Sequence, residues 1–211
     1  MQSDTKKIGA LMISVIANVS LIWIFVSSLL FPEKNIDFIL KTGFLIFIIE
    51  FFSIHSSAFA TVAVGAQLAP PWMKRFWFKV SLFTFYCLFV IVIAFVYNNW
   101  FLPFLFLSSL ATKFFLKKAV DRSIVSMVAP FISIGLFVIS GITIGFFLPS
   151  FFESTFPFPA EIMQVATEDG GGLFEEAPQL LLGWGVLYYS LSLIVDLIIF
   201  FVTRRMKTEQ I

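Results

Sequence analysis

The amino-acid sequence predicts an all-α membrane protein with six transmembrane helices and both termini in the cytoplasm. The first observation is composition: 59% of the 211 residues are hydrophobic and 13% are charged, against roughly 45–50% and about 25% in soluble domains. Such a chain has too little polar surface to cover itself in water. The second is that its apolar residues form runs of about 20, the length that crosses a hydrocarbon core about 30 Å thick. We therefore expect one transmembrane domain over residues 1–211.

The apolar runs define the six expected spans. The first follows two lysines and is too long for the core of a signal peptide, so we expect it to stay uncleaved. Pro70 and Pro71 end the second span, because proline lacks an amide hydrogen and clashes with the preceding helical turn. Asn98 and Asn99 mark a tight turn after the third. The six spans cover residues 8–31, 38–66, 76–97, 101–116, 124–148 and 179–202.

The third observation is the distribution of basic residues, which fixes the orientation. With the N-terminus inside, twelve of the 14 Lys and Arg residues fall in cytoplasmic segments, and only Lys34 and Lys41 fall outside. Cytoplasmic loops carry such an excess, and an odd number of spans would place one terminal cluster on the wrong side. We therefore expect a multi-pass protein of a bacterial-type cytoplasmic (inner) membrane. The twelve are Lys6, Lys7, Lys74, Arg75, Lys79, Lys113, Lys117, Lys118, Arg122, Arg204, Arg205 and Lys207.

The segment 149–178 is expected to be an acidic outer loop, because it contains six carboxylates and no Lys or Arg. It either attracts cations as a vestibule or simply avoids basic residues, as outer loops do. Glu175 and Glu176 stand where the sixth span begins, a position at which the helix dipole stabilises acidic groups. The alternative is that both join Glu50 and His55 in one outer-facing site.

Two carboxylates and one imidazole are expected inside the membrane. A charge near the bilayer centre costs about 2.5–3.5 kcal/mol on insertion scales, so such a residue faces protein or water. Glu50 and His55, the only histidine, lie in the second span, and Asp196 lies in the sixth. Helical spacing places Ser53 and Ser57 on the face of Glu50, with His55 about 140° away. Glu50 and His55 should therefore contact different neighbours.

The sixth span carries a polar and small-residue seam at intervals of three and four residues, which is the spacing of a helix–helix contact. We expect this seam and the second span to build a polar centre, with Asp196 nearer the cytoplasm than Glu50. The seam consists of Gly185, either Tyr188 or Tyr189, Ser192 and Asp196.

Two further pairs are expected to hold helices together. Gly141 and Gly145 form a small-xxx-small pair in the fifth span, which lets a neighbouring helix approach closely. Ser14 and Asn18 in the first span offer an interhelical hydrogen bond. Both patterns are more typical of packing than of chemistry.

Several function classes are disfavoured. Nucleic-acid binding needs a clustered basic face, and basic residues here flank the membrane spans. A single cysteine, Cys87, excludes an intrachain disulfide and a CxxC redox site. One histidine cannot supply bis-histidine haem ligation or the usual zinc ligands. His55 and Ser56 point about 100° apart on a helix and make a poor base–nucleophile pair. We therefore assign no catalytic residue, metal ligand or cofactor.

Three hypotheses remain for function. The first is movement of a small solute, cation or proton through the polar centre, since buried Glu, His and Asp can change charge near physiological pH. The alternative is a non-catalytic partner or assembly subunit, whose polar faces meet another membrane protein or a second copy. The third is an intramembrane enzyme or cofactor-binding protein. The candidate binding or proton-handling residues are Glu50, His55, Ser53, Ser57, Asp196, Tyr189, Ser192, Glu175 and Glu176.

Overall fold

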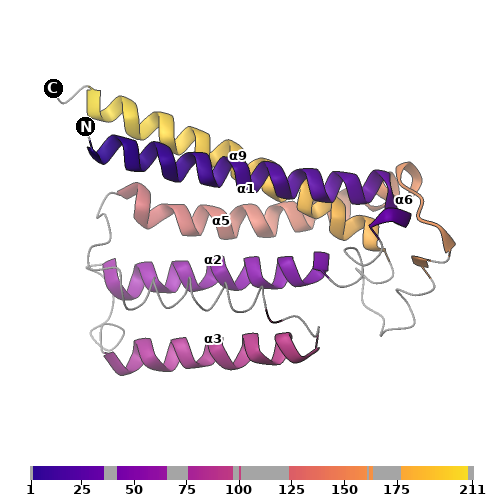
Figure 1. Ribbon diagram of the computed structural model, residues 1–211, viewed down its shortest axis with the longest axis horizontal. Coiled ribbons are helices and arrows are strands. Elements are labelled where there is room, and N and C mark those ends of the chain that lie inside the picture. The colour runs from indigo at the N-terminus through magenta and orange to yellow at the C-terminus, as the bar shows by residue number, and fades with distance from the viewer. Residues whose placement is uncertain are drawn as a thin grey trace. The chain divides into compact units, whose positions relative to one another are not determined.

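The computed structural model confirms the all-α class: all regular secondary structure in its described residues is helical (Figure 1). It describes residues 2–35, 42–65, 76–96, 100, 124–160, 162–163 and 177–208. A 3-10 turn, η1 (Pro32–Lys34), follows the first helix, and a π-helix, η4 (Thr143–Phe147), continues the fourth described one. The α-helices are α1 (Gln2–Leu30), α2 (Gly43–Gly65), α3 (Phe76–Val96), α5 (Ile124–Ile142), α6 (Pro149–Thr155) and α9 (Pro178–Thr208).

Helices cover five of the expected spans, and the expected span 101–116 lies outside the described residues. Among the described helices, three segments are long and apolar enough to cross a membrane: Phe76–Phe95, Pro130–Phe147 and Pro178–Phe201. α1 and α2 contain shorter apolar stretches. By length and composition, these three segments could cross a membrane, which suggests membrane association.

The chain divides into two compact units. Unit 1 comprises Met1–Gly43 and Leu136–Ile211, and unit 2 comprises Phe44–Gly135. The boundary falls inside α5, whose last residues, together with η4, belong to unit 1.

In unit 1, α1 and α9 pack along each other in opposite directions (Figure 1). The fully buried Phe25 of α1 lies against Gly185, where a Cβ would come within 2.6 Å of its ring, and stacks on Tyr189 with centroids 5.8 Å apart. Ser14 meets Asp196 further along. The two helices are therefore antiparallel, and the start of α1 and the end of α9 lie together.

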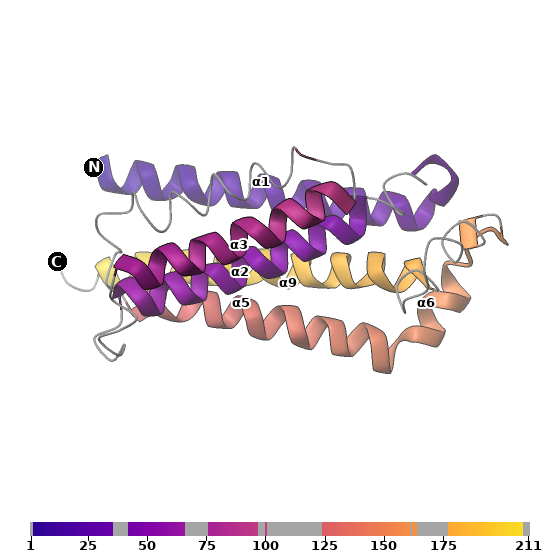
Figure 2. The same cartoon turned by 90° about the horizontal axis from the view of Figure 1, so that it is seen from below.

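The start of α9 also contacts η4 and α6 of unit 1. Figure 2 shows the chain turning after α5 into α6, beside the first turns of α9. Phe152 of α6 lies so close to Gly183 that a Cβ there would come within 2.4 Å of its ring. Ile144 of η4 packs with Ala177 and Leu180 in a small apolar core. Glycine at position 183 is therefore what allows α6 to pack against α9.

The segment expected to be an outer loop begins with α6, which the sequence analysis did not predict. Leu148 leaves helical geometry at φ −122° and ψ 14°, and Pro149 then starts a new seven-residue helix. Proline favours this first position because its fixed φ suits a helix and its missing amide hydrogen is not needed there. Pro149 was thus the overlooked signal.

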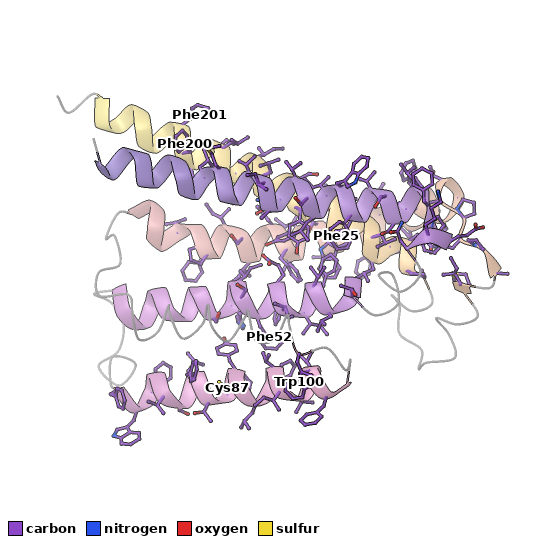
Figure 3. All side chains as sticks on the ribbon, viewed as in Figure 1. Phe25, Phe52, Cys87, Trp100, Phe200 and Phe201 are labelled. Atoms are coloured by element: carbon purple, nitrogen blue, oxygen red, sulfur yellow. The ribbon has the colours of Figure 1, made fainter. Side chains whose placement is uncertain are left out.

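In unit 2, α2 and α3 pack side by side through aromatic rings. Phe52 of α2 lies against Tyr86, with centroids 5.9 Å apart, and against Phe89 at 4.2 Å. Tyr86 and Val90 form the buried core of this contact. Figure 3 shows Phe52 directed from α2 towards α3, just as Phe25 is directed inward from α1 within unit 1.

Candidate functional site

The candidate site is a hydrogen-bonded cluster that joins α1 to α9. Ser14 Oγ donates a hydrogen bond of 2.5 Å to Asp196 Oδ2, and Asn18 Nδ2 donates a longer one of 3.4 Å to the same oxygen. Asn18 Nδ2 also lies 3.5 Å from Ser14 Oγ. We call Ser14, Asn18 and Asp196 the Asp196 cluster. A carboxylate from one long apolar helix is thus bound by two donors from another.

Helical periodicity explains why these residues meet. Ser14 and Asn18 are four residues apart and share one face of α1. Asn18 is buried, whereas Ser14 and Asp196 are half-buried. Asp196 was expected in a polar centre with the second span, but its described hydrogen-bond partners lie on the first. The spacing identified the face of α9 correctly and gave no information on which helix would cover it.

The predicted seam of α9 is confirmed as a packing surface. Gly185 and Tyr189 contact Phe25, and Asp196 contacts Ser14, so all three face α1. The choice left open between two tyrosines is settled: Tyr189 faces α1, whereas Tyr188 turns to the ring of Phe137 on α5, 5.3 Å away. Ser192, which lies between Tyr189 and Asp196 in the sequence, is half-buried.

Ser14 and Asp196 lie at similar distances from the basic ends of their respective helices. Ser14 is seven residues beyond Lys7 in α1, about 10 Å at 1.5 Å per residue, and Asp196 is eight residues before Arg204 in α9, about 12 Å. The polar pair on α1 and the carboxylate on α9 therefore stand at matching distances from the two basic clusters. That match was the signal in the sequence that could have paired them.

The described partners of Asp196 are all neutral. A serine hydroxyl both donates and accepts, whereas an ionised carboxylate only accepts and a protonated one also donates. Ser14 can therefore serve either protonation state of Asp196.

Comparison with protein-family models, with curated proteins and with solved structures finds no match. The chemistry of the described residues is accordingly the ground for assigning a function. Those residues contain no group of three or more His, Cys, Asp or Glu side chains that could hold a metal ion.

The candidates on the second span lie in unit 2. Glu50, Ser53 and His55 are all half-buried on α2. The ring of His55 lies 5.3 Å from that of Phe51, and the backbone carbonyl of Ser53 accepts a 3.0 Å hydrogen bond from the hydroxyl of Ser56. Each of the three takes part in an interaction with another group.

Three of the predicted candidates fall wholly or partly outside what the structure describes. Glu175 and Glu176 lie outside the described residues, and Ser57 is described only as part of α2. The first described turn of α9 follows directly, and its residues are buried on every side, including Gln179 at 5% exposed. Gln179 Oε1 has no hydrogen-bond partner there.

A second polar contact in unit 1 has no titratable group. Trp184 of α9 donates from Nε1 to Ser140 Oγ at 2.9 Å and to the carbonyl oxygen of Phe137 at 3.2 Å. Its indole lies on Gly141, where a Cβ would be 3.0 Å from the ring. The predicted close approach is thus confirmed at Gly141, whereas at Gly145 no described atom lies within 4 Å of the Cβ position and the close approach stays a prediction.

Proposed function

We propose that the chain is a six-span protein of a bacterial-type cytoplasmic membrane, with both termini inside, which moves a proton or another small cation. Asp196 is its ion-binding carboxylate. The observation that carries the proposal is an ionisable side chain in an apolar helix whose described hydrogen-bond donors are neutral. An ionisable residue inside a span marks an ion or proton path more often than a purely structural contact.

The ends of the α1–α9 pair support this orientation. Because the helices are antiparallel, the start of α1 and the end of α9 share one end of unit 1 (Figure 1). An excess of Lys and Arg at a helix end is typical of the cytoplasmic side. The basic residues brought to this end are Lys6, Lys7, Arg204, Arg205 and Lys207.

Exposed side chains support a lipid environment. Trp77 and Trp100 lie near the two ends of α3 and are 76% and 50% exposed, as expected of tryptophans at the two membrane interfaces. Along α1, large apolar side chains at intervals of four, three and four residues are exposed on one face, which hydrocarbon solvates better than water. They are Met12, Ile16, Val19 and Trp23.

Magnitudes favour an ion-handling role over a purely structural one. Interhelical hydrogen bonds in membranes contribute about 0.6–2 kcal/mol each, whereas an ionised Asp at the centre of a span costs about 2.5–3.5 kcal/mol. Asparagine at position 196 could make similar hydrogen bonds without a charge. Packing of Phe25 on Gly185 and Tyr189 already holds the two helices together. A titratable group at this place therefore indicates a function that uses the charge.

The test is ion flux through the purified full chain in liposomes, with a pH-sensitive dye inside and an imposed membrane potential. We expect flux from the native protein and none from Asp196→Asn. The matched control is Glu33→Gln, which removes an exposed carboxylate in η1 and should leave flux unchanged. Equal flux from Asp196→Asn would contradict the proposal. Absence of flux together with a stoichiometric co-purifying membrane protein would favour the partner-subunit alternative.

A further inference from the structure

We infer that the ion bound at the Asp196 cluster is a proton, taken up directly by the Asp196 carboxylate, and that the Ser14 hydroxyl changes its hydrogen bond when this happens. The inference rests on the proposed function and names its substrate. It follows from the hydrogen atoms and lone pairs that the cluster presents.

The atoms around Asp196 suit a proton better than a metal cation. A metal cation is held by the lone pairs of several oxygens. Here Ser14 directs its O–H and Asn18 its N–H at Asp196 Oδ2. Because these polar hydrogens occupy the space next to the carboxylate oxygen, a cation there would meet positive rather than negative ends of dipoles. A proton needs only one carboxylate lone pair.

The protonation step balances without any further reactant. A hydronium ion gives a proton to a lone pair of a carboxylate oxygen: one O–H bond of hydronium breaks and leaves water, one O–H bond of the neutral acid forms, and no electron is transferred. The hydroxyl of Ser14 can then accept from the acid and turn its own hydrogen to the backbone carbonyl of Ala10, one turn earlier. Proton release reverses both changes.

The alternative bond for Ser14 has a direct parallel in the same helix. Ser28 Oγ donates to the carbonyl oxygen of Ile24, four residues earlier, at 2.8 Å. Serine side chains commonly bond in this way inside helices. By the same helical geometry, the Ala10 carbonyl offers Ser14 a second acceptor besides the Asp196 carboxylate, so that its hydroxyl can be satisfied in either protonation state.

Few charged groups compete with Asp196 for control of its protonation. On the packed face of α1 the neighbours are Ser14 and Asn18, both neutral. α5 has no ionisable side chain within Ile124–Ile142. The charged residues of α1 and α9 other than Asp196 all lie towards the helix ends and are Asp4, Lys6, Lys7, Arg204, Arg205 and Lys207. The other titratable side chains of these two helices are Tyr188 and Tyr189 of α9.

A hydrophobic carbodiimide tests the inference, because it reacts with a protonated carboxyl and not with a carboxylate. The full chain in detergent is treated with dicyclohexylcarbodiimide over a range of pH, and the adduct is located by peptide mass spectrometry. We expect one adduct at Asp196 that forms at acidic pH and is lost at alkaline pH. Replacing choline chloride by sodium or potassium chloride at constant ionic strength should not change its yield.

Variants separate proton binding from a general effect on the fold. Asp196→Asn should lose the adduct, and Glu33→Gln should retain it. Ser14→Ala should move the midpoint of labelling to higher pH, because a hydrogen bond to the charged form is stronger than one to the neutral form. Ser14→Thr, which keeps the hydroxyl, should restore the native midpoint. Circular dichroism checks that helix content is the same in all four.

Three results would overturn the inference: protection of Asp196 by Na⁺ or K⁺, labelling that does not vary with pH, or no adduct at Asp196. Labelling needs no transport, so its failure is distinguishable from failure of the proposed function. Normal pH-dependent labelling without flux would reject ion movement and leave proton binding in place. Flux with cation protection would retain transport and replace the proton by a metal cation.

Discussion

Two helix contacts of α9, an extensive one with α1 and a local one with α5, both pack an aromatic ring on a glycine and differ in their chemistry. Against α1, the ring of Phe25 lies on Gly185, and against α5, the ring of Trp184 lies on Gly141. Both contacts also contain hydrogen bonds between side chains. The α5 contact uses only an indole and a hydroxyl, neither of which changes charge near neutral pH. The α1 contact adds the carboxylate of Asp196. Close packing is therefore common to both contacts, and the titratable group of the α1 contact is the feature on which the proposed function rests.

The largest expected effect is on flux, at the α1 contact. Asp196→Asn should abolish ion movement and change the free energy of unfolding by no more than about 1 kcal/mol, because the amide has the same shape and can still bond Ser14 and Asn18. The liposome assay tests the expected loss of flux, and thermal unfolding in detergent tests the small change in stability. A large loss of stability with proportional loss of flux would make Asp196 structural, as Trp184 is.

The second prediction concerns the largest expected loss of stability, which comes from enlarging Gly185. In Gly185→Val, the new side chain would overlap the ring of Phe25, and overpacking a tight contact costs about 1–3 kcal/mol. We expect a lower unfolding temperature in detergent. The matched control is Gly135→Ala, where no described atom lies within 4 Å of the Cβ position and alanine favours the helix. If both variants unfold at the native temperature, the α1–α9 contact is looser than described.

A smaller effect is expected at the α5 contact. Trp184→Phe removes the donor of the bonds to Ser140 and to the carbonyl of Phe137 and should lower stability by about 1–2 kcal/mol. Proton flux per folded molecule should not change. Urea titration and flux at matched protein density test the two statements, and a selective loss of flux would remove the distinction between the two contacts.

The smallest effect is expected at Asn18. Its hydrogen bond to Asp196 is long, 3.4 Å. We therefore expect Asn18→Ala to lower the free energy of unfolding by only about 0.6 kcal/mol, the average for interhelical hydrogen bonds in a membrane protein. Ser14, whose hydrogen bond to Asp196 is much shorter, should have the larger influence on the pH at the midpoint of carbodiimide labelling. A greater shift of the carbodiimide labelling midpoint from Asn18→Ala than from Ser14→Ala would reverse this ranking.

The helices were predictable because the length of an apolar run is a strong signal. The third span was expected at 76–97, and α3 covers Phe76–Val96. α6 was missed because seven residues are too few to show a period, although Pro149 marked its start. The end of the fifth span as a π-helix likewise has no simple sequence pattern.

The candidate site was predictable only in part. Spacing correctly placed Gly185, Tyr189 and Asp196 on one packed face, because helical periodicity alone decides which residues share a face. It could not name α1 as the neighbour, since that depends on the tertiary arrangement. The close approach predicted at Gly145 stays a prediction, because no described atom lies near its Cβ position. The roles of Glu50 and His55 stay predictions.

The pairing of α1 with α9 sets an order on how the protein is made. Ser14 and Asp196 are 182 residues apart in the chain, and at about 5–20 residues per second the ribosome needs roughly 10–40 s to synthesise what lies between. In the proposed membrane topology, α1 would lie in the bilayer during that time without its final neighbour, with Ser14 and Asn18 lacking their acceptor. Biogenesis of unit 1 is thus completed late, and a chain halted before α9 should be a natural substrate for membrane quality control.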